Sequence, residues 1–249
     1  MANQKGGVGK TTTVASLGAA LAELGRRVLL VDLDPQACLT FAVGLDSGEV
    51  VLSAYDVLAD GIPATMAVRS TLDGPDLLPA TIDLAACEAL LAPVHGREQR
   101  LRTALAPLAD SYDDVLVDCP PTLGLLTLNG LTAADELLVP VQAETLAFRG
   151  VDQLLDTVED EVQRLYNPGL RVRGALPTQY DSRAAHGREI LAALSDKYGM
   201  TVLEPAIPRS VRFAEAPAAG RSVLATARRT RGAHAYRALA RNLLAARTA

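Results

Sequence analysis

Two lysines stand five positions apart in a glycine-rich segment near the start of the sequence. Residues 5–12 read Lys-Gly-Gly-Val-Gly-Lys-Thr-Thr. Gly6, Gly7 and Gly9 allow a tight turn whose backbone N–H groups point inward, where they can hold an anion. A helix that begins directly after such a loop also favours negative charge at its amino end. The segment is therefore expected to bind phosphate groups.

The side chains of this segment predict a site for ATP and Mg²⁺. Lys10 is expected to reach the β- and γ-phosphates, Thr11 to offer its hydroxyl to Mg²⁺, and Thr12 to bond an α-phosphate oxygen. Only three of the 24 basic residues are lysines, and a compact ammonium group fits among phosphates better than a broad guanidinium does. The standard pattern GxxxxGK[ST] is not met, because Gln4 stands at its first glycine position. The alternative is a plain glycine-rich turn before a helix.

Three aspartates end apolar runs that read as buried strands. Asp32 and Asp34 lie in VDLDPQ, and Asp118 ends VLVD before CPP. In open α/β sheets ligands bind at the carboxyl ends of the strands, so these acids are expected to lie near the nucleotide. The alternative is that each aspartate caps the helix that follows it.

Strand-like and helical patterns alternate along the chain. The strand-like runs cover 27–32, 114–119, 136–141, 171–177 and, more weakly, 201–207; the helical patterns cover 10–24, 97–109, 125–134, 147–166, 183–198 and 232–246. Several runs are apolar on both faces, as parallel strands covered by helices are. The pattern predicts an α/β fold with a doubly wound, mostly parallel sheet and helices on both faces. We expect residues 1–249 to form a single domain.

Two segments fit this pattern poorly. The glycines, aspartates and prolines of 42–83 predict loops and short helices around a connection. The glycine-rich loop begins at residue 5, which leaves only residues 1–4 for the strand that should lead into it. Either that strand is very short or the natural start lies upstream.

Composition narrows the class of protein. The sequence has no run of 18 apolar residues that would predict a membrane span, and its first residues, MANQKGG, contain no apolar signal region. The three cysteines, Cys38, Cys87 and Cys119, are scattered without a CxxC pair, which fits a reducing cytosol and excludes a cysteine metal clamp. A cytoplasmic location is therefore expected.

Charge is divided unevenly along the chain. Residues 1–150 carry a balance of −10 and residues 151–249 a balance of +5. After Pro205 there are nine arginines and a single acid, Glu215. A basic end on an acidic body suggests a polyanionic partner. The alternative is a set of solvated arginines on helix surfaces.

The segment Lys5-Gly6-Gly7-Val8-Gly9-Lys10-Thr11 resembles the deviant Walker A loop of the superclass that contains ParA, MinD and the nitrogenase iron protein. Within that superclass the chain resembles the ParA/Soj DNA-partitioning ATPases over nearly its whole length. The matching blocks, in family order, are NQKGGVGKTTT, RVLLVDLDPQ, VDCPPTLGLLTLNGLTAAD, VPVQAE, IPRSVRFAEAP and TRGAHAY.

The resemblance implies roles for particular residues. Lys5 would reach across a nucleotide-sandwich homodimer to the partner's ATP, Asp118 would hold Mg²⁺ as a Walker B carboxylate, and Asp34 would orient the attacking water beside the metal. Pro208 and Ser210 would border the adenine. The family usually has asparagine at the Ser210 position and often reads DPQGNAT where this chain has DPQACLT, so different contacts are expected at both places.

The resemblance also implies partners. The dimer would hold nonspecific double-stranded DNA on the nucleoid, and a ParB-type centromere-binding protein would stimulate slow ATP hydrolysis. The expected DNA contacts are Arg183, Arg221, Arg228, Arg229 and Arg231. No base-reading motif accompanies them, so contact is expected with phosphates rather than with base edges.

Other proteins of the superclass have functions that make different demands on the sequence. A MinD-like membrane ATPase would need a C-terminal amphipathic anchor, but the last helical pattern is mostly Ala and Leu, and Leu239, Leu243 and Leu244 fit core packing as well. An iron–sulfur carrier would need paired cysteines. A small-molecule amide-forming relative stays open. No membrane partner is expected.

Overall fold

Runs that are apolar on both faces form the strands of the molecule. The computed structural model describes residues 1–144, 147–181 and 185–248. Four of the expected strands are present: β1 (Val28–Asp32), β4 (Asp114–Asp118), β5 (Glu136–Gln142) and β6 (Arg171–Thr178). Every residue of β1 is buried, as expected for a parallel strand with helices on both sides.

The strand order matches the expected mostly parallel sheet. One group runs β2-β3-β1-β4 and the other pairs β5 with β6. β1 is parallel to β3 (Asp76–Leu78) and β4, and β5 is parallel to β6. Among the strands of the described residues, β2 (Arg69–Ser70) alone is antiparallel, and it pairs with β3. The α/β fold class predicted from the alternating pattern is confirmed.

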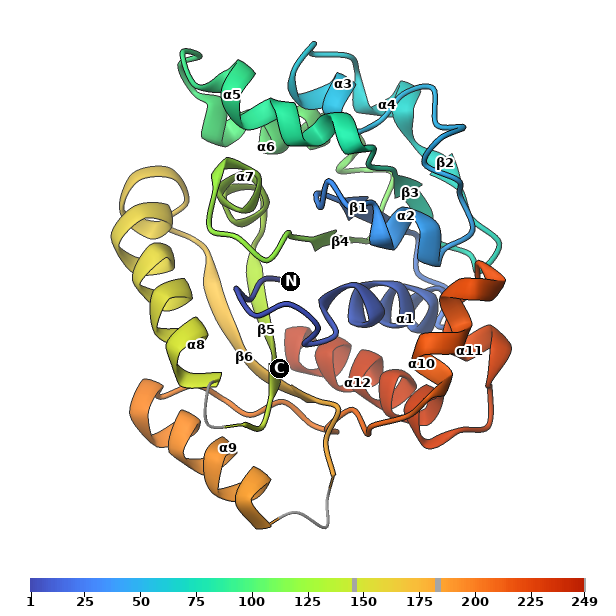
Figure 1. The fold of residues 1–249 in the computed structure, drawn as a ribbon, viewed down its shortest axis with the longest axis vertical. Coiled ribbons are helices and arrows are strands. Elements are labelled where there is room, and N and C mark those ends of the chain that lie inside the picture. The colour runs from blue at the N-terminus through green and yellow to red at the C-terminus, as the bar shows by residue number, and fades with distance from the viewer. Residues whose placement is uncertain (145–146, 182–184, 249) are drawn as a thin grey trace.

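The first residues lie between the two groups of strands. The Met1 ammonium donates to Val117 O at 2.7 Å, and Cys119 N donates to Met1 O at 3.2 Å. On the other side, Asn3 Nδ2 donates to Pro140 O of β5 at 2.7 Å. Residues 1–3 are not a strand, but they hydrogen-bond both β4 and β5 at the position where a strand leading into the loop would run (Figure 1).

Helices cover both faces of the strands (Figure 1). On one side lie α1 (Lys10–Glu23), α10 (Arg212–Glu215), α11 (Val223–Thr226) and α12 (Arg231–Thr248), with α2 (Cys38–Ala42) near them. The other side carries α3 (Ala54–Leu58), α4 (Ala64–Ala67), α5 (Cys87–Leu91), α6 (Arg100–Leu105) and α7 (Leu125–Ala133). Beside β5 and β6 are α8 (Ala147–Asp156), the π-helical segment η4 (Thr157–Tyr166) and α9 (Ala185–Tyr198). Short 3₁₀ turns are η1 (Ile82–Ala86), η2 (Arg97–Gln99), η3 (Ala106–Leu108) and η5 (Ala216–Ala219).

The alternation of side chains along β1 divides the interior into two cores. Leu29 and Val31 belong to the larger cluster, with apolar residues of α3, α6, α7 and α8. Val28 and Leu30 belong to the second cluster, which α1 and α12 complete. Gly18 of α1 lies so close to Leu30 that an added Cβ would be 2.6 Å from Leu30 Cδ2. Close approach of α1 to β1 fixes the start of α1, and therefore the loop before it, at the carboxyl edge of the strands.

Three expectations about elements were wrong or incomplete. The run 201–207 is not a strand; it makes one isolated bridge, between Val202 and Ala175, and Pro205 cannot donate to a ladder. The helix expected over 97–109 is divided into η2, α6 and η3, and Pro107 lies in the last turn. The segment 42–83 contains α3 and α4 as expected, but also the strands β2 and β3.

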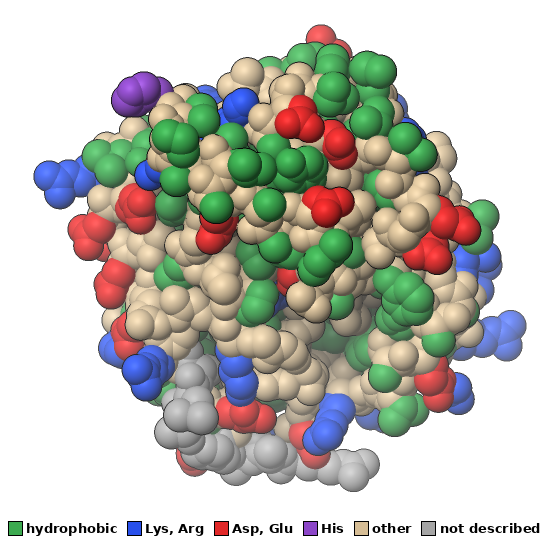
Figure 2. Space-filling model, turned by 45° about the horizontal axis from the view of Figure 1, so that its top comes forward, with side chains coloured by type: hydrophobic (Ala, Val, Ile, Leu, Met, Phe, Trp, Pro, Cys, Tyr) green, Lys and Arg blue, Asp and Glu red, His purple; other side chains and the backbone are tan. Residues whose placement is uncertain are grey.

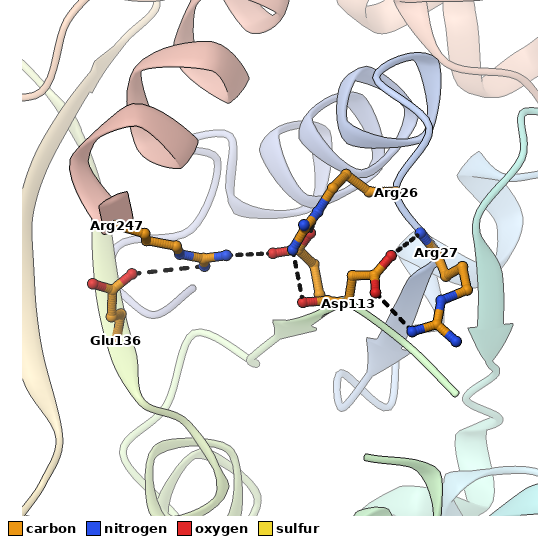
Figure 3. A network of polar contacts seen from close by, with 6 residues as sticks. Arg26, Arg27, Asp113, Glu136 and Arg247 are labelled. Atoms are coloured by element: carbon orange, nitrogen blue, oxygen red, sulfur yellow. Dashed lines mark hydrogen bonds and ion pairs between the residues drawn. The ribbon is translucent and has the colours of Figure 1, made fainter. Parts of the chain in front are cut away.

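An ionic network joins the amino ends of the strands, opposite the glycine-rich loop (Figure 3). The buried carboxylate of Asp114 accepts from Arg26 Nε at 2.8 Å and from Arg247 Nη1. Arg247 of α12 also lies 3.7 Å from Glu136 of β5. Arg27 donates to Asp113 from its backbone N and its guanidinium. The C-terminal helix is thereby tied to both β4 and β5.

Candidate functional site

The glycine-rich loop turns tightly into the first helix. Gly7 and Gly9 have φ of 74° and 84°, values that glycine adopts at little cost. Gly9 is the N-cap of α1, and Lys10 is its first residue. Loop and helix therefore present the unpaired N–H groups of a helix amino terminus at the edge of the sheet.

Lys10 is held inside this loop. Its side chain is buried with the residue only 7% exposed, and its Nζ lies 3.5 Å from Lys5 O. Burial lowers the pKa of Lys10, and the nearby carboxylate of Asp118 partly opposes that shift. An anion brought to the loop would therefore strengthen the charged form of this lysine.

The end of β4 brings a carboxylate to the first turn of α1. Thr11 Oγ1 donates to Asp118 Oδ2 at 2.6 Å. Asp118 is completely buried, and within the described part of the chain its Oδ1 has no hydrogen-bond partner. Burial, and then repulsion from Asp32, raise the pKa of Asp118 to about 7. A buried, unpartnered carboxylate oxygen beside a hydroxyl is costly unless a cation or a donor completes it.

Asp32, at the end of β1, holds the chain that follows it. It accepts from Thr40 N at 2.9 Å, from Thr40 Oγ1 at 2.8 Å and from Asp34 N at 3.1 Å. Burial raises its pKa to about 6, against the opposing effect of these hydrogen bonds. These hydrogen bonds hold the segment between β1 and α2 in place.

Asp34 is only partly buried and lines the cavity beside the phosphate loop. Its Oδ1 accepts from Gln36 N at 2.9 Å, which closes a turn before α2. The residue that follows this turn, Ala37, has a φ of 52°. The structure thus brings Asp34 and Asp118 to the same edge, as expected from their positions after neighbouring strands.

A cavity of about 620 Å³ opens over the loop. Its polar wall includes Lys10, Thr11 and Asp34, and its apolar wall includes Phe41 and Phe213. The remaining lining residues are Gly6, Gly7, Gly9, Thr12, Ala15, Ser16, Gln36, Cys38, Ala42, Pro121, Gln179, Ala216, Pro217, Arg221, Ser222 and Val223. Its volume is that of an ordinary small-molecule site.

A second cavity of about 340 Å³ adjoins the first and shares Gly9, Thr12, Gln179 and Phe213 with it. Ser210, expected from the resemblance to border the adenine, lines this second cavity. Pro208, the other residue expected there, does not line it; it forms an isolated bridge with Tyr180. Val8 is buried under the loop with 1% exposure and can contribute only its backbone.

Lys5 points away from the loop cavity. Its Nζ donates to Glu144 Oε2 at 2.6 Å, and both side chains are partly exposed, at 30% and 61%. The ion pair lies at the surface, where such pairs contribute little to stability. Lys5 is therefore free to exchange this partner for another.

Two residues at the end of β6 contact the loop and were missed by the sequence analysis. Thr178 Oγ1 lies 2.7 Å from Val8 O, and Gln179 Nε2 donates to Gly7 O at 2.6 Å. No local pattern marks them, because they lie about 170 residues from the loop in sequence.

The arginines expected to contact DNA do not form one group. Arg183 lies outside the described residues. Arg221 donates to the carboxylate of Asp73 and also lines the large cavity. Arg228, Arg229 and Arg231 are exposed, and in the described ranges none of their side chains forms an ion pair. Arg228 and Arg229 line a shallow hollow with Arg237, whose charge Glu23 balances.

The acidic face of the molecule lies elsewhere. Figure 2 turns forward the side covered by α3 to α6, where acidic and apolar side chains occupy the middle and basic ones lie mostly toward the edges. The exposed large apolar residues of this region are Val51, Met66, Leu72, Ile82, Leu90 and Val94. A polyanion would not be attracted to this face.

The donors at the loop fit a nucleotide-bound Mg²⁺ rather than a metal held by protein alone. Nowhere in residues 1–144, 147–181 or 185–248 do three His, Cys, Asp or Glu side chains converge as a metal cluster. Mg²⁺ is commonly held by one or two carboxylates together with phosphate oxygens and water. The hydroxyl of Thr11 and the unpartnered oxygen of Asp118 provide such a partial shell.

Comparison with known proteins points to one family. A family model described as an AAA domain, AAA_31, matches residues 1–172. The sporulation initiation inhibitor protein Soj of Bacillus subtilis is 43% identical to this chain, over 98% of this chain and 96% of Soj. The chromosome partitioning protein ParA of Caulobacter vibrioides is 41% identical, over 98% and 92% of the two chains.

A solved structure is similar over the same length. A crystal structure described as cobyrinic acid a,c-diamide synthase from Mycobacterium smegmatis, with bound ATP analogue and magnesium, superposes with a TM-score of 0.87. It is 52% identical, and the match covers 98% of this chain and 92% of that one.

Proposed function

Since the chain belongs to the ParA/Soj family of P-loop ATPases with an AAA_31 domain, we propose that it is an ATP-dependent dimerising switch that partitions DNA. In the ATP state two subunits would close around two nucleotides and hold nonspecific double-stranded DNA. A ParB-type partner would then stimulate a slow hydrolysis that releases the DNA. The single observation that carries the nucleotide part of the proposal is the buried, unpartnered Asp118 Oδ1 beside Thr11, directly at a glycine-rich anion cradle; the DNA and ParB parts are supported by similarity to Soj and ParA.

Residues of the loop and of the ends of β1 and β4 would have different roles at the nucleotide. Lys5, Gly6, Gly7, Val8, Gly9, Lys10, Thr11 and Thr12 would contact the phosphates. Thr11 and Asp118, with Asp34 near them, would hold Mg²⁺, which neutralises charge on the phosphate oxygens when bound. Asp34 would orient the attacking water from the cavity wall. Pro208 and Ser210 would border the adenine in the adjoining cavity.

Dimer formation would change the partner of Lys5. Its ion pair with Glu144 is at the surface, so little free energy opposes a new contact with the partner's ATP. Residues 1–249 would act as one domain, because Met1 and Asn3 bond both strand groups and α12 packs along α1.

DNA would contact the exposed arginines at and before the start of α12. Arg228, Arg229 and Arg231 are the unpaired candidates, and Arg221 would have to leave Asp73 to join them. Phosphate contact by arginine is insensitive to sequence and sensitive to salt. The molecule would lie in the cytoplasm, on the nucleoid.

The MinD-like alternative is less well supported. Tyr236, Leu239 and Ala240 of α12 are buried in the core against α1, so this side of the helix is not available to a lipid surface. None of the described helices is long and apolar enough to cross a bilayer.

The second candidate is an ATP-dependent amide synthetase. It is favoured by the similarity to the M. smegmatis structure described as a diamide synthase, and the cavity beyond the loop has an apolar end with Phe41 and Val223. A synthetase would release ADP only when its carboxylic acid and a nitrogen donor are present. Cobyrinic acid with ammonia is the direct probe.

The first experiment is sedimentation of the protein with nonspecific duplex DNA, and separately with anionic liposomes, in ATP, ADP or no nucleotide. We expect DNA binding only with ATP, retained by Asp34→Ala and lost by Lys10→Ala. Binding to liposomes without binding to DNA would refute the partitioning switch. ADP release that depends on cobyrinic acid, without DNA binding, would instead establish the synthetase.

A further inference from the structure

Two consecutive carbonyl groups of the phosphate loop accept hydrogen bonds from two consecutive side chains at the end of β6. Val8 O accepts from Thr178, whose hydroxyl also lies 3.1 Å from Val141 O of β5. Gly7 O accepts from the Gln179 amide. The Thr178 contact is buried and the Gln179 contact is at the surface of the cavity.

This arrangement fixes the direction of the loop's N–H groups. A trans peptide unit is planar, and its C=O and N–H point in opposite directions. When Gly7 O and Val8 O point to Gln179 and Thr178, the N–H groups of Val8 and Gly9 must point away from these two residues, and Gly9 itself lines the cavity. In the described part of the chain neither of these N–H groups has a backbone partner. We propose that Thr178 and Gln179 are positioning residues that preorganise the loop to bind the phosphate chain.

The backbone of Gln179 is strained in a way that suits this task. Its φ is 50°, in the left-handed region that non-glycine residues seldom adopt. Directly after it, Tyr180 N donates to Ile207 O at 2.9 Å. The strand therefore turns sharply at Gln179 and sends its side chain back to the loop. Such strain at the edge of a ligand cavity points to function rather than to folding.

The strained backbone of Gln179 makes it possible to distinguish a positioning role of this residue from a purely structural role by experiment. Gln179→Gly removes the amide but relieves the left-handed backbone. If Gln179 only supported the fold, any loss of affinity in the glycine variant would go together with a loss of stability. If Gln179 positions the loop, the variant keeps its stability and loses affinity for phosphates.

The test uses inorganic pyrophosphate with Mg²⁺, which displaces a fluorescent ADP from the full-length protein. Pyrophosphate reports on the phosphate loop without contacts from a base. For Gln179→Gly we expect an unchanged or higher melting temperature and a Kd for pyrophosphate raised by about 3- to 10-fold, the usual effect of one hydrogen bond. Thr178→Val should weaken binding by at least as much, and Thr178→Ser, which keeps the hydroxyl, should restore it.

This inference rests on the proposed nucleotide function, and the experiment distinguishes the two. If the natural protein binds neither ADP nor pyrophosphate, the nucleotide function is wrong. If the natural protein binds both and Gln179→Gly binds pyrophosphate with an unchanged Kd, only the positioning role is wrong. Because Thr178→Val removes a buried contact and can unfold the chain, the glycine and serine variants decide the outcome without it.

Discussion

At the scale of single residues, Asp118 lies between a hydroxyl that donates to it and a carboxylate that repels it. Thr11 bonds one of its oxygens, and Asp32 raises its pKa together with burial. Such an arrangement is unfavourable for the protein alone and favourable once a cation is bound. Stability of the free protein and affinity for Mg²⁺-nucleotide should therefore respond in opposite directions to the charge of this residue.

Asp118→Asn should stabilise the nucleotide-free protein at neutral pH. Burial raises the pKa of Asp118 in the folded protein to about 7 from an ordinary value of 3.8. As pH rises, the carboxyl of Asp118 therefore ionises in the unfolded chain at a lower pH than in the folded protein. The natural protein therefore loses stability between about pH 4 and pH 7, and the asparagine variant does not. We expect its advantage to grow from pH 5 to pH 7 and then to level off at ~1–2 kcal/mol. Thermal melting without Mg²⁺ measures this difference.

The companion measurement is nucleotide affinity. Asp118→Asn should weaken Mg²⁺-ATP binding and leave the weak binding without Mg²⁺ nearly unchanged. Asp110→Asn, at an exposed position, is the control for both readouts. A stability advantage that shrinks as pH rises would contradict the raised pKa.

At the scale of elements, a buried carboxylate forms ion pairs that connect the strand ends opposite the phosphate loop. Asp114 begins β4 and binds Arg26 before β1 and Arg247 of α12. The carboxylate of Asp113 beside it binds Arg27 at the surface, and Arg26 reaches the backbone carbonyl of Asp113. The side chain of Asp114 therefore joins β4 to α12 and to the segment before β1, whereas the side chain of Asp113 binds only within the segments that precede β1 and β4.

Asp114→Asn should lower the free energy of unfolding by ~1–3 kcal/mol, because a charged group with two arginine partners is replaced by a neutral one. Asp113→Asn is the matched control and should cost less, since exposed pairs contribute little. Urea denaturation at pH 7 compares the two. Equal losses would mean that burial of Asp114 adds nothing.

A second junction depends on two glycines that approach each other. Gly44 follows α2 and Gly220 follows η5, with φ of 93° and 61°. A Cβ on Gly44 would lie 2.8 Å from Gly220 O. Since α2 and η5 both line the large cavity, this contact joins two of its walls.

Gly44→Ala should cost ~2–4 kcal/mol, because a left-handed backbone and a clash with fixed backbone atoms act together. Gly61→Ala has a similar φ of 73° with open space around the new methyl group, so it isolates the backbone effect at about 1 kcal/mol. Chemical denaturation of both variants provides the comparison. A Gly44→Ala loss no larger than that of Gly61→Ala would show that the two loops can separate freely.

At the scale of the whole molecule, charge is separated between faces. The side covered by α3 to α6 presents acidic side chains (Figure 2), whereas Arg228, Arg229 and Arg231 are exposed near the start of α12. A polyanion should therefore approach one side only, and its binding should depend on few arginines.

The triple variant Arg228→Ala, Arg229→Ala and Arg231→Ala should weaken ATP-dependent DNA binding and reduce its dependence on salt. Each lost phosphate contact should lower the slope of log K against log salt by about 0.9. Arg102→Ala with Arg164→Ala removes exposed arginines elsewhere and should leave the slope unchanged. An unchanged slope in the triple variant, with normal ATP binding, would place the DNA contacts on other residues.

The sequence alone determined the features that depend on local spacing. Glycines and lysines within eight residues predicted the loop, and runs apolar on both faces predicted β1, β4, β5 and β6, because backbone conformation follows from neighbouring side chains. Acids at the ends of β1 and β4 then had to meet at one edge, since parallel strands share their carboxyl ends. Asp34 and Asp118 could be placed together for this reason.

Only the tertiary structure decided the contacts between distant segments. β3 has three residues and becomes a strand because β1 offers it a partner. Arg221 meets Asp73, and Thr178 and Gln179 meet the phosphate loop, across long stretches of chain. No local pattern encodes such pairs, because they form only when packing of the helices on the sheet brings the loops to one edge.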